Sequence, residues 1–189
     1  MSPNQTPASS CGVHLILSAK SSGPAGPASR LAKVPRESLQ PRFTESLTAA
    51  GQEVFEMMVG IPLGPAEAAT LPRVADYTAM IGLAGDLCGV LSFRCGLGSA
   101  VQIAGRMLGT DERASEESIR DALGEICNMV AGSFKARLSD LADQCMLSVP
   151  TVVSGKDYQL HPLADGLRIQ VSQTFEGALI WMTLDLHGI

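Results

Sequence analysis

One run of the sequence gathers side chains that could do chemistry: "DALGEICNMVAGSFK", residues 121–135. The run has helical periodicity, and at about 100° per residue its polar members share one side of a helix. These members are Asp121, Glu125, Asn128 and Gly132. The stripe they form presents two carboxylates, one amide and a patch of bare backbone. A carboxylate can hold a cationic group, and a neutral amide can orient a water molecule because it both donates and accepts hydrogen bonds.

The same stripe also has a plain interpretation, because a solvated helix face carries polar residues without any function. Gly132 is harder to explain in this way, since a glycine inside a helix costs about 1 kcal/mol relative to alanine. A close approach of another backbone at Gly132 would account for it. The spacing alone leaves both interpretations open.

Such a stripe needs a helix with a buried opposite face, and the sequence predicts one over residues 115 to about 139. Ser115 is placed to cap its N-terminus, and acidic residues in the first turn suit the helix dipole. The expected core row lies opposite the stripe and consists of Ile119, Leu123, Ile126, Val130 and Phe134. Cys127 lies toward the apolar side without a histidine nearby in sequence, so we expect a packed thiol and not a nucleophile.

The other segments alternate between helical and strand-like patterns. A first helix is predicted from about Pro41 to a stop at residues 60–62, and a short helix is predicted to end at Gly109. Apolar, partly β-branched runs predict strands in residues 74–85, 87–95, 145–155 and 166–186. The run 145–155 is broken at Pro150, and the last run turns near Phe175–Gly177. The expected architecture is α+β, with two long helices packed on an antiparallel or mixed sheet.

The two long helices resemble each other in sequence. Residues 45–60 and 117–132 align without gaps, and six of the sixteen aligned positions are identical. The identities include Glu53 with Glu125 and Gly60 with Gly132. Two amphipathic helices can share apolar spacing by chance, but amphipathicity does not explain shared glycines and a shared glutamate. We therefore predict a tandem pseudo-repeat of helix-plus-strands units within one domain.

The composition favours a single globular domain. Of the 189 residues, 46% are hydrophobic and 17% are charged, and the net charge of −5 disfavours nucleic acid as a partner. No apolar run is long enough to span a membrane, so we expect no membrane partner and a cytoplasmic protein. Residues 1–38 are rich in Pro, Ser, Ala and Gly and are predicted to form a flexible tail before a domain at 39–189. The histidines and cysteines lack the spacing of metal ligands, so no metal site is expected.

The stripe and its surroundings resemble the CheX branch of the CheC/CheX/FliY phosphatases of bacterial chemotaxis. The family motif is an Asp or Ser, a Glu four residues later, an Asn three residues after that, and a proline some twenty residues further on. Here those positions are Asp121, Glu125, Asn128 and Pro150. The resemblance covers roughly residues 42–186. It implies a tandem pseudo-repeat fold, a homodimer, and dephosphorylation of a phosphorylated response-regulator receiver domain such as CheY.

The resemblance also implies a role for each residue of the stripe. The amide of Asn128 would hold the attacking water, and Glu125 would pair with the receiver's active-site lysine. Asp121 would add a contact at the rim, and Gly132 would leave room for the partner. This chain would bind no cofactor itself, because the Mg²⁺ ion would belong to the receiver.

The first helix keeps the glutamate as Glu53 but has Glu56 at the position that corresponds to Asn128. An ionised carboxylate has no donor and repels an anionic phosphoryl group, so one site per chain is predicted, on the second helix. Two other functions stay open. One is a non-catalytic module that binds a receiver or a flagellar switch component, although binding alone would not need Asn128. The other is a structural protein whose helix face is only solvated.

Overall fold

The described part of the chain forms three helices and one antiparallel sheet. The computed structural model describes residues 34–66, 75–109, 114–141, 143–156, 158, 160 and 166–188. The helices are α1 (Arg36–Met58), α2 (Leu97–Leu108) and α3 (Glu116–Arg137). The strands are β1 (Gly64–Pro65), β2 (Tyr77–Ala84), β3 (Gly89–Cys95), β4 (Met146–Leu147), β5 (Thr151–Ser154), β6 (Leu167–Phe175) and β7 (Ala178–Leu186). The α+β class predicted from the sequence is confirmed.

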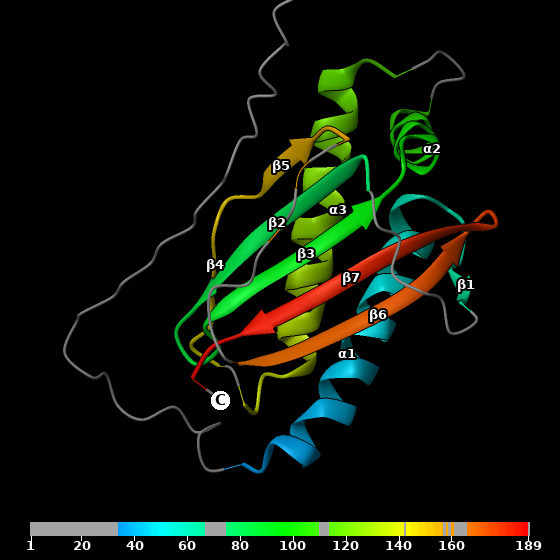
Figure 1. Cartoon of the computed structure of the whole chain (residues 1–189). Helices are drawn as coiled ribbons and strands as arrows, with labels where there is room; N and C mark the ends of the chain where they lie inside the picture. Colours follow the sequence, from blue (N-terminus) through cyan, green and yellow to red (C-terminus); the bar gives the residue numbers. More distant parts are fainter. Residues whose placement is uncertain are drawn as a thin grey trace, which may run out of the picture.

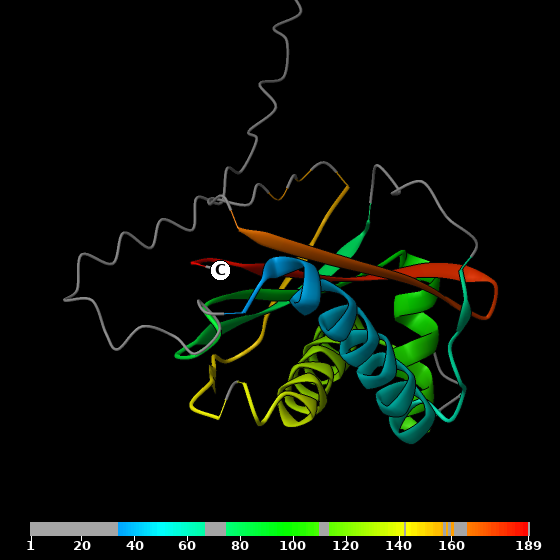
Figure 2. The same cartoon turned by 90° about the horizontal axis from the view of Figure 1, so that it is seen from below.

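The sheet has the strand order β1-β6-β7-β3-β2-β4, and β5 pairs with β2 farther along the same edge. Every strand pair among the described residues is antiparallel, so the sheet is not mixed. All three helices lie on one face of it (Figures 1 and 2). β6 therefore alternates buried and exposed residues, because only its inward side chains lie under the helices.

The sheet contains two hairpins, and their strands fall within the runs 74–85, 87–95 and 166–186 that the sequence predicted as strands. β2 pairs with β3, and β6 pairs with β7 up to Phe175 and Ala178. Between these two residues, Glu176 and Gly177 both have positive φ, at 47° and 81°. Two successive positive φ values are typical of a type I′ turn, whose twist matches that of the flanking strands. The turn predicted near Phe175–Gly177 is thus confirmed.

Helix α1 begins earlier than the sequence suggested. It starts at Arg36 and contains Pro41, and at 23 residues it is one residue longer than α3. A proline this far inside a helix leaves one backbone carbonyl of the preceding turn without its usual donor. The buried Leu39 and Phe43 lie on either side of it, so packing on the core holds the first turns in helical form. Of the predicted tail, residues 1–38, positions 1–33 lie outside the described residues. Its last three residues, 36–38, form the start of α1.

Helices α1 and α3 pack against each other and against the sheet. Phe43 of α1 meets Phe134 of α3 edge to face, with ring centroids 6.0 Å apart. Toward the sheet, Phe55 lies 5.4 Å from the ring of Phe175 and 5.9 Å from that of Phe93. These fully buried aromatic rings tie α1 to both β6 and β3, so the position of α1 is set by the core and not by its own propensity.

The two halves of the chain follow the same order of elements. In each half a long helix is followed by short strands and a hairpin, with β1 alone in the first half, β4 and β5 in the second, and α2 between the halves. The short strands pair across the halves, β1 with β6 and β5 with β2. A duplicated unit would produce this arrangement, and the duplication itself stays a prediction. No helix of the described residues has the length and apolar character needed to cross a bilayer.

Candidate functional site

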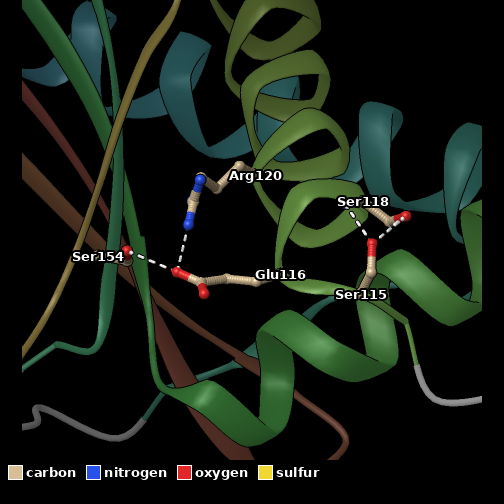
Figure 3. Close-up of polar contacts among 5 residues, drawn as sticks. All are labelled: Ser115, Glu116, Ser118, Arg120 and Ser154. Carbon is tan, nitrogen blue, oxygen red and sulfur yellow. Dashed lines mark hydrogen bonds and ion pairs between the residues drawn. The ribbon is translucent and has the colours of Figure 1, made fainter.

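Helix α3 carries the stripe, and local interactions fix both of its ends. The Oγ atom of Ser115 accepts a hydrogen bond from the backbone N–H of Ser118 at 3.1 Å (Figure 3). Acidic residues occupy the first turn and basic residues the last, as the helix dipole favours. The predicted cap is confirmed, and the helix ends at Arg137, close to the expected end near residue 139.

The apolar side of α3 is buried as predicted. The core row of Ile119, Leu123, Ile126, Val130 and Phe134 is inaccessible or nearly so. Cys127 is also fully buried, and this burial raises the pKa of its thiol to about 12. A thiol that stays protonated is a poor nucleophile, so the prediction of a packed cysteine is confirmed.

The four residues of the stripe lie on the opposite side of α3. Asp121 and Glu125 are exposed, and Asn128 and Gly132 are half-buried. Within the described part of the chain, no side-chain hydrogen bond or ion pair engages Asp121, Glu125 or Asn128. A Cβ atom added at Gly132 would meet no atom of another described segment within 4 Å, so no neighbouring backbone among the described residues accounts for that glycine. The stripe is therefore available to a partner along its whole length.

A polar cluster ties the N-terminal turn of α3 to strand β5. The carboxylate of Glu116 accepts hydrogen bonds from the guanidinium of Arg120 and from Ser154 Oγ, the latter at 3.4 Å (Figure 3). The hydrogen bond from Arg120 is the main reason why the pKa of Glu116 is lowered. Both side chains are largely exposed, so this contact contributes little to the stability of the fold.

The segment before β5 lies against α3 beside the stripe. A Cβ atom built on Gly124 would lie 3.7 Å from the ring carbons of Pro150 and 3.6 Å from Val152 Cγ2. Gly124 is next to Glu125 and precedes Asn128 by one helical turn, so Pro150 flanks the stripe at the level of these two residues. The structure thus brings the proline of the motif to the helix that carries the carboxylates and the amide.

Gly124 is the residue of this site that sequence reasoning missed. Like Gly132, Gly124 lies inside the helix and has the same helix cost of about 1 kcal/mol relative to alanine. Gly124 is the point on α3 against which Pro150 packs, and this contact is apparent only in the tertiary structure. Two glycines eight residues apart in one helix are the signal that could have pointed to two separate contact points on it.

The equivalent position on α1 is occupied by an interhelical contact. Glu53 Oε2 accepts hydrogen bonds from Ser133 Oγ and from Arg137 Nη2, both at 2.7 Å. These bonds, with that from Ser133 contributing most, lower the pKa of Glu53. Glu125 has no such partners among the described residues. The two related glutamates therefore differ: one joins α1 to α3, and the other faces outward.

The two hollows described on the surface lie along α1. One, of about 440 Å³, is lined by Ala49, Gln52, Glu53, Glu56, Met57 and Arg137. Another, of about 580 Å³, lies over the start of the same helix. Neither includes a residue of the stripe, and no three His, Cys, Asp or Glu side chains of the described residues are grouped to hold a metal ion. An open helix face of this kind suits a reaction on a group that another protein carries.

Known proteins resemble this chain in the region that carries the stripe. The family model described as chemotaxis phosphatase CheX matches residues 77–174, which contain the whole of α3 and Pro150. A curated relative, the CheY-P phosphatase CheX of Thermotoga maritima, is 25% identical over 135 residues. The alignment covers 69% of this chain and 87% of that relative.

Solved structures share the fold over most of their length. The crystal structure of chemotaxis protein CheX from Vibrio vulnificus has a TM-score of 0.68 at 25% identity, covering 77% of this chain and 96% of that one. The CheX of the CheX–CheY–BeF3–Mg²⁺ complex from Borrelia burgdorferi has a TM-score of 0.64 at 16% identity, covering 76% and 97%. With the fold, the exposed stripe on α3 and the family match together, this chain belongs to the chemotaxis phosphatase CheX family.

Proposed function

We propose that this chain is a phosphatase that accelerates hydrolysis of the aspartyl phosphate on a CheY-like receiver domain. The observation that carries the proposal is the unengaged pair of Glu125 and Asn128 on the outer side of α3, in a chain of the CheX family. The Thermotoga relative is named as a CheY-P phosphatase, which supports the substrate class. We also infer that the protein acts in the cytoplasm, where response regulators work.

In the proposed chemistry, this chain contributes one thing, which is the positioning of a water molecule. A receiver holds its own aspartyl phosphate and a Mg²⁺ ion, which neutralises the phosphoryl charge. The amide of Asn128 enters that site and holds a water in line with the scissile bond. The water oxygen bonds to phosphorus while the bond to the aspartyl oxygen breaks, so inorganic phosphate leaves and the carboxylate is restored. Positioning is the main contribution a protein can make to phosphoryl transfer.

In this proposal, the other stripe residues determine how the receiver domain is placed on α3. Glu125 pairs with the receiver's active-site lysine, which fixes the register and draws that lysine from the phosphate. Asp121 adds a contact at the rim, one turn toward the N-terminus of α3. Gly132 leaves the space that the partner's surface fills, in keeping with an added Cβ that would meet no other described segment within 4 Å.

The test is the decay of a phosphorylated receiver with and without the full chain. CheY-like receivers of the source organism are phosphorylated with a small phosphodonor, the donor is removed, and phosphate release is followed. We expect the chain to accelerate the decay of at least one receiver catalytically. Binding without acceleration would favour the non-catalytic module, and neither binding nor acceleration would favour a merely solvated helix face.

The structure supports one active site per chain, on α3. The corresponding glutamate of α1, Glu53, is engaged by Ser133 and Arg137, and the exposed Glu56 supplies no amide. Replacing Glu56 by glutamine is therefore expected to leave the phosphatase rate within about twofold of wild type, because surface changes away from the site have small effects. The rate constant of receiver dephosphorylation measures this. A loss comparable to that of an Asn128 variant would contradict a single site.

We further propose a homodimer. Among the described residues, β6 is paired on its outer side only at residues 173–174, by the two residues of β1, so most of that edge is open. An open edge offers unpaired N–H and C=O groups to another strand. Sedimentation equilibrium is expected to give about twice the chain mass of 19.8 kDa. A mass that stays at that of one chain at micromolar concentration would contradict the dimer.

A further inference from the structure

One apolar side chain stands out on the surface, one residue before Pro150. Val149 is 83% exposed, the highest value among the large hydrophobic residues that the structure describes as exposed. It belongs to the short segment Ser148–Pro150 between β4 and β5, which we call the 148–150 ridge. Single exposed hydrophobic residues are common on protein surfaces and need no explanation by themselves. Val149 differs from such residues in the rigidity of its segment and in its position one residue before Pro150.

The ridge is held on both sides by strand β2. The backbone N–H of Ser148 donates to Gly82 O, and the N–H of Gly82 donates to Ser148 Oγ, both at 2.9 Å. Ser148 Oγ in turn donates to the carbonyl of Val149 at 2.9 Å. β4 and β5, which flank the ridge, also pair with β2. These bonds fix the backbone of the ridge on β2, and the following proline restricts the backbone of Val149 to extended conformations.

The ridge is also fixed to the helix that carries the catalytic pair. The ring of Pro150 lies 3.7 Å from the position of a Cβ on Gly124, one helical turn before Asn128. A standard interface covers about 800 Å² on each partner, which corresponds to a disc with a radius of about 16 Å. One helical turn is only about 5.4 Å long. A protein that delivers a phosphoryl group to Asn128 is therefore large enough to reach the ridge as well.

We propose that the 148–150 ridge is a docking element for the phosphorylated receiver domain, and that Val149 is the apolar contact that sets the affinity of the complex. This inference rests on the proposed function, since the receiver is the occupant to which it commits. The stripe itself is polar and contributes two carboxylates, so it supplies register and water positioning more than apolar contact. A rigid apolar anchor beside it costs little ordering entropy when the partner binds.

The experiment separates binding from chemistry. Val149→Ser is assayed with the CheY-like receiver that the wild-type chain dephosphorylates fastest, at receiver concentrations that reach saturation. We expect KM to rise about tenfold, in line with truncation of an anchor residue, while kcat stays within about twofold of wild type. The Kd for the same receiver loaded with beryllofluoride and Mg²⁺, measured by titration calorimetry, should rise by the same factor. Val149→Ile keeps the apolar contact and should keep KM near the wild-type value.

The matched control is Leu108→Ser, which removes an exposed hydrophobic side chain from the end of α2, an element that contributes nothing to the stripe. It should leave KM unchanged, and thermal unfolding should show that all three variants are folded. If the wild-type chain is active and Val149→Ser has a wild-type KM, the docking inference is overturned while the phosphatase function stands. If the wild-type chain accelerates the decay of no receiver, the proposed function and this inference fall together.

Discussion

Replacing Asn128 by alanine is expected to lower the maximal rate of receiver dephosphorylation by about a hundredfold or more, because one positioned polar group commonly contributes that much to a transition state. Asn128 is the one residue of the stripe whose neutral amide can both donate to and accept from a water molecule. Its side chain has no partner within the described chain, so its removal breaks no internal hydrogen bond. The measurement is kcat with a saturating phosphorylated receiver.

Two controls make this result specific. Asn128→Asp keeps the shape of the side chain but replaces the donor by a charge that repels the phosphoryl group, so it should be as inactive as alanine. Both variants should unfold near the wild-type temperature, and the alanine variant should still bind the beryllofluoride-loaded receiver. An alanine variant that binds and retains full activity would show that the water is held by another group.

Replacing Phe55 by alanine is expected to lower the free energy of unfolding by about 3–5 kcal/mol, the usual range for a large aromatic residue removed from a core. Phe55 is fully buried and packs on Phe93 and Phe175, with ring centroids at 5.9 and 5.4 Å. Its loss therefore leaves a cavity where α1, β3 and β6 meet. Urea unfolding followed by circular dichroism measures the effect.

Met57→Ala is the matched control, since Met57 lies two residues away on the same helix and is 63% exposed. Its free energy of unfolding should stay within about 0.5 kcal/mol of wild type. If Phe55→Ala were as mild as this control, the junction of α1 with the sheet would not be part of the cooperative core. At temperatures where the Phe55 variant is still folded, its phosphatase activity should survive, because the proposed site lies on α3.

The features of the fold that the sequence predicted correctly depend on residues that are close together in the chain. The amphipathic period, the Ser115 cap and the stripe of α3 all depend on residues within four positions of one another, so the sequence was enough to predict them. The hairpin turn at Glu176–Gly177 has the same local origin. The start of α1 was predicted too late, because Leu39 is held by tertiary burial in spite of Pro41.

The sequence by itself determined the helix, its polar stripe and the contrast between Asn128 and Glu56, since these follow from side-chain chemistry and a period of 3.6 residues. Only the tertiary structure decided which glutamate is free. Glu53 is engaged by Arg137, 84 residues away, and Glu125 is not engaged within the described chain. The tertiary structure alone also placed Pro150 on Gly124 and left Val149, one residue earlier, exposed on the surface. Contacts between distant segments depend on which faces the whole core buries together, and no local pattern encodes that choice.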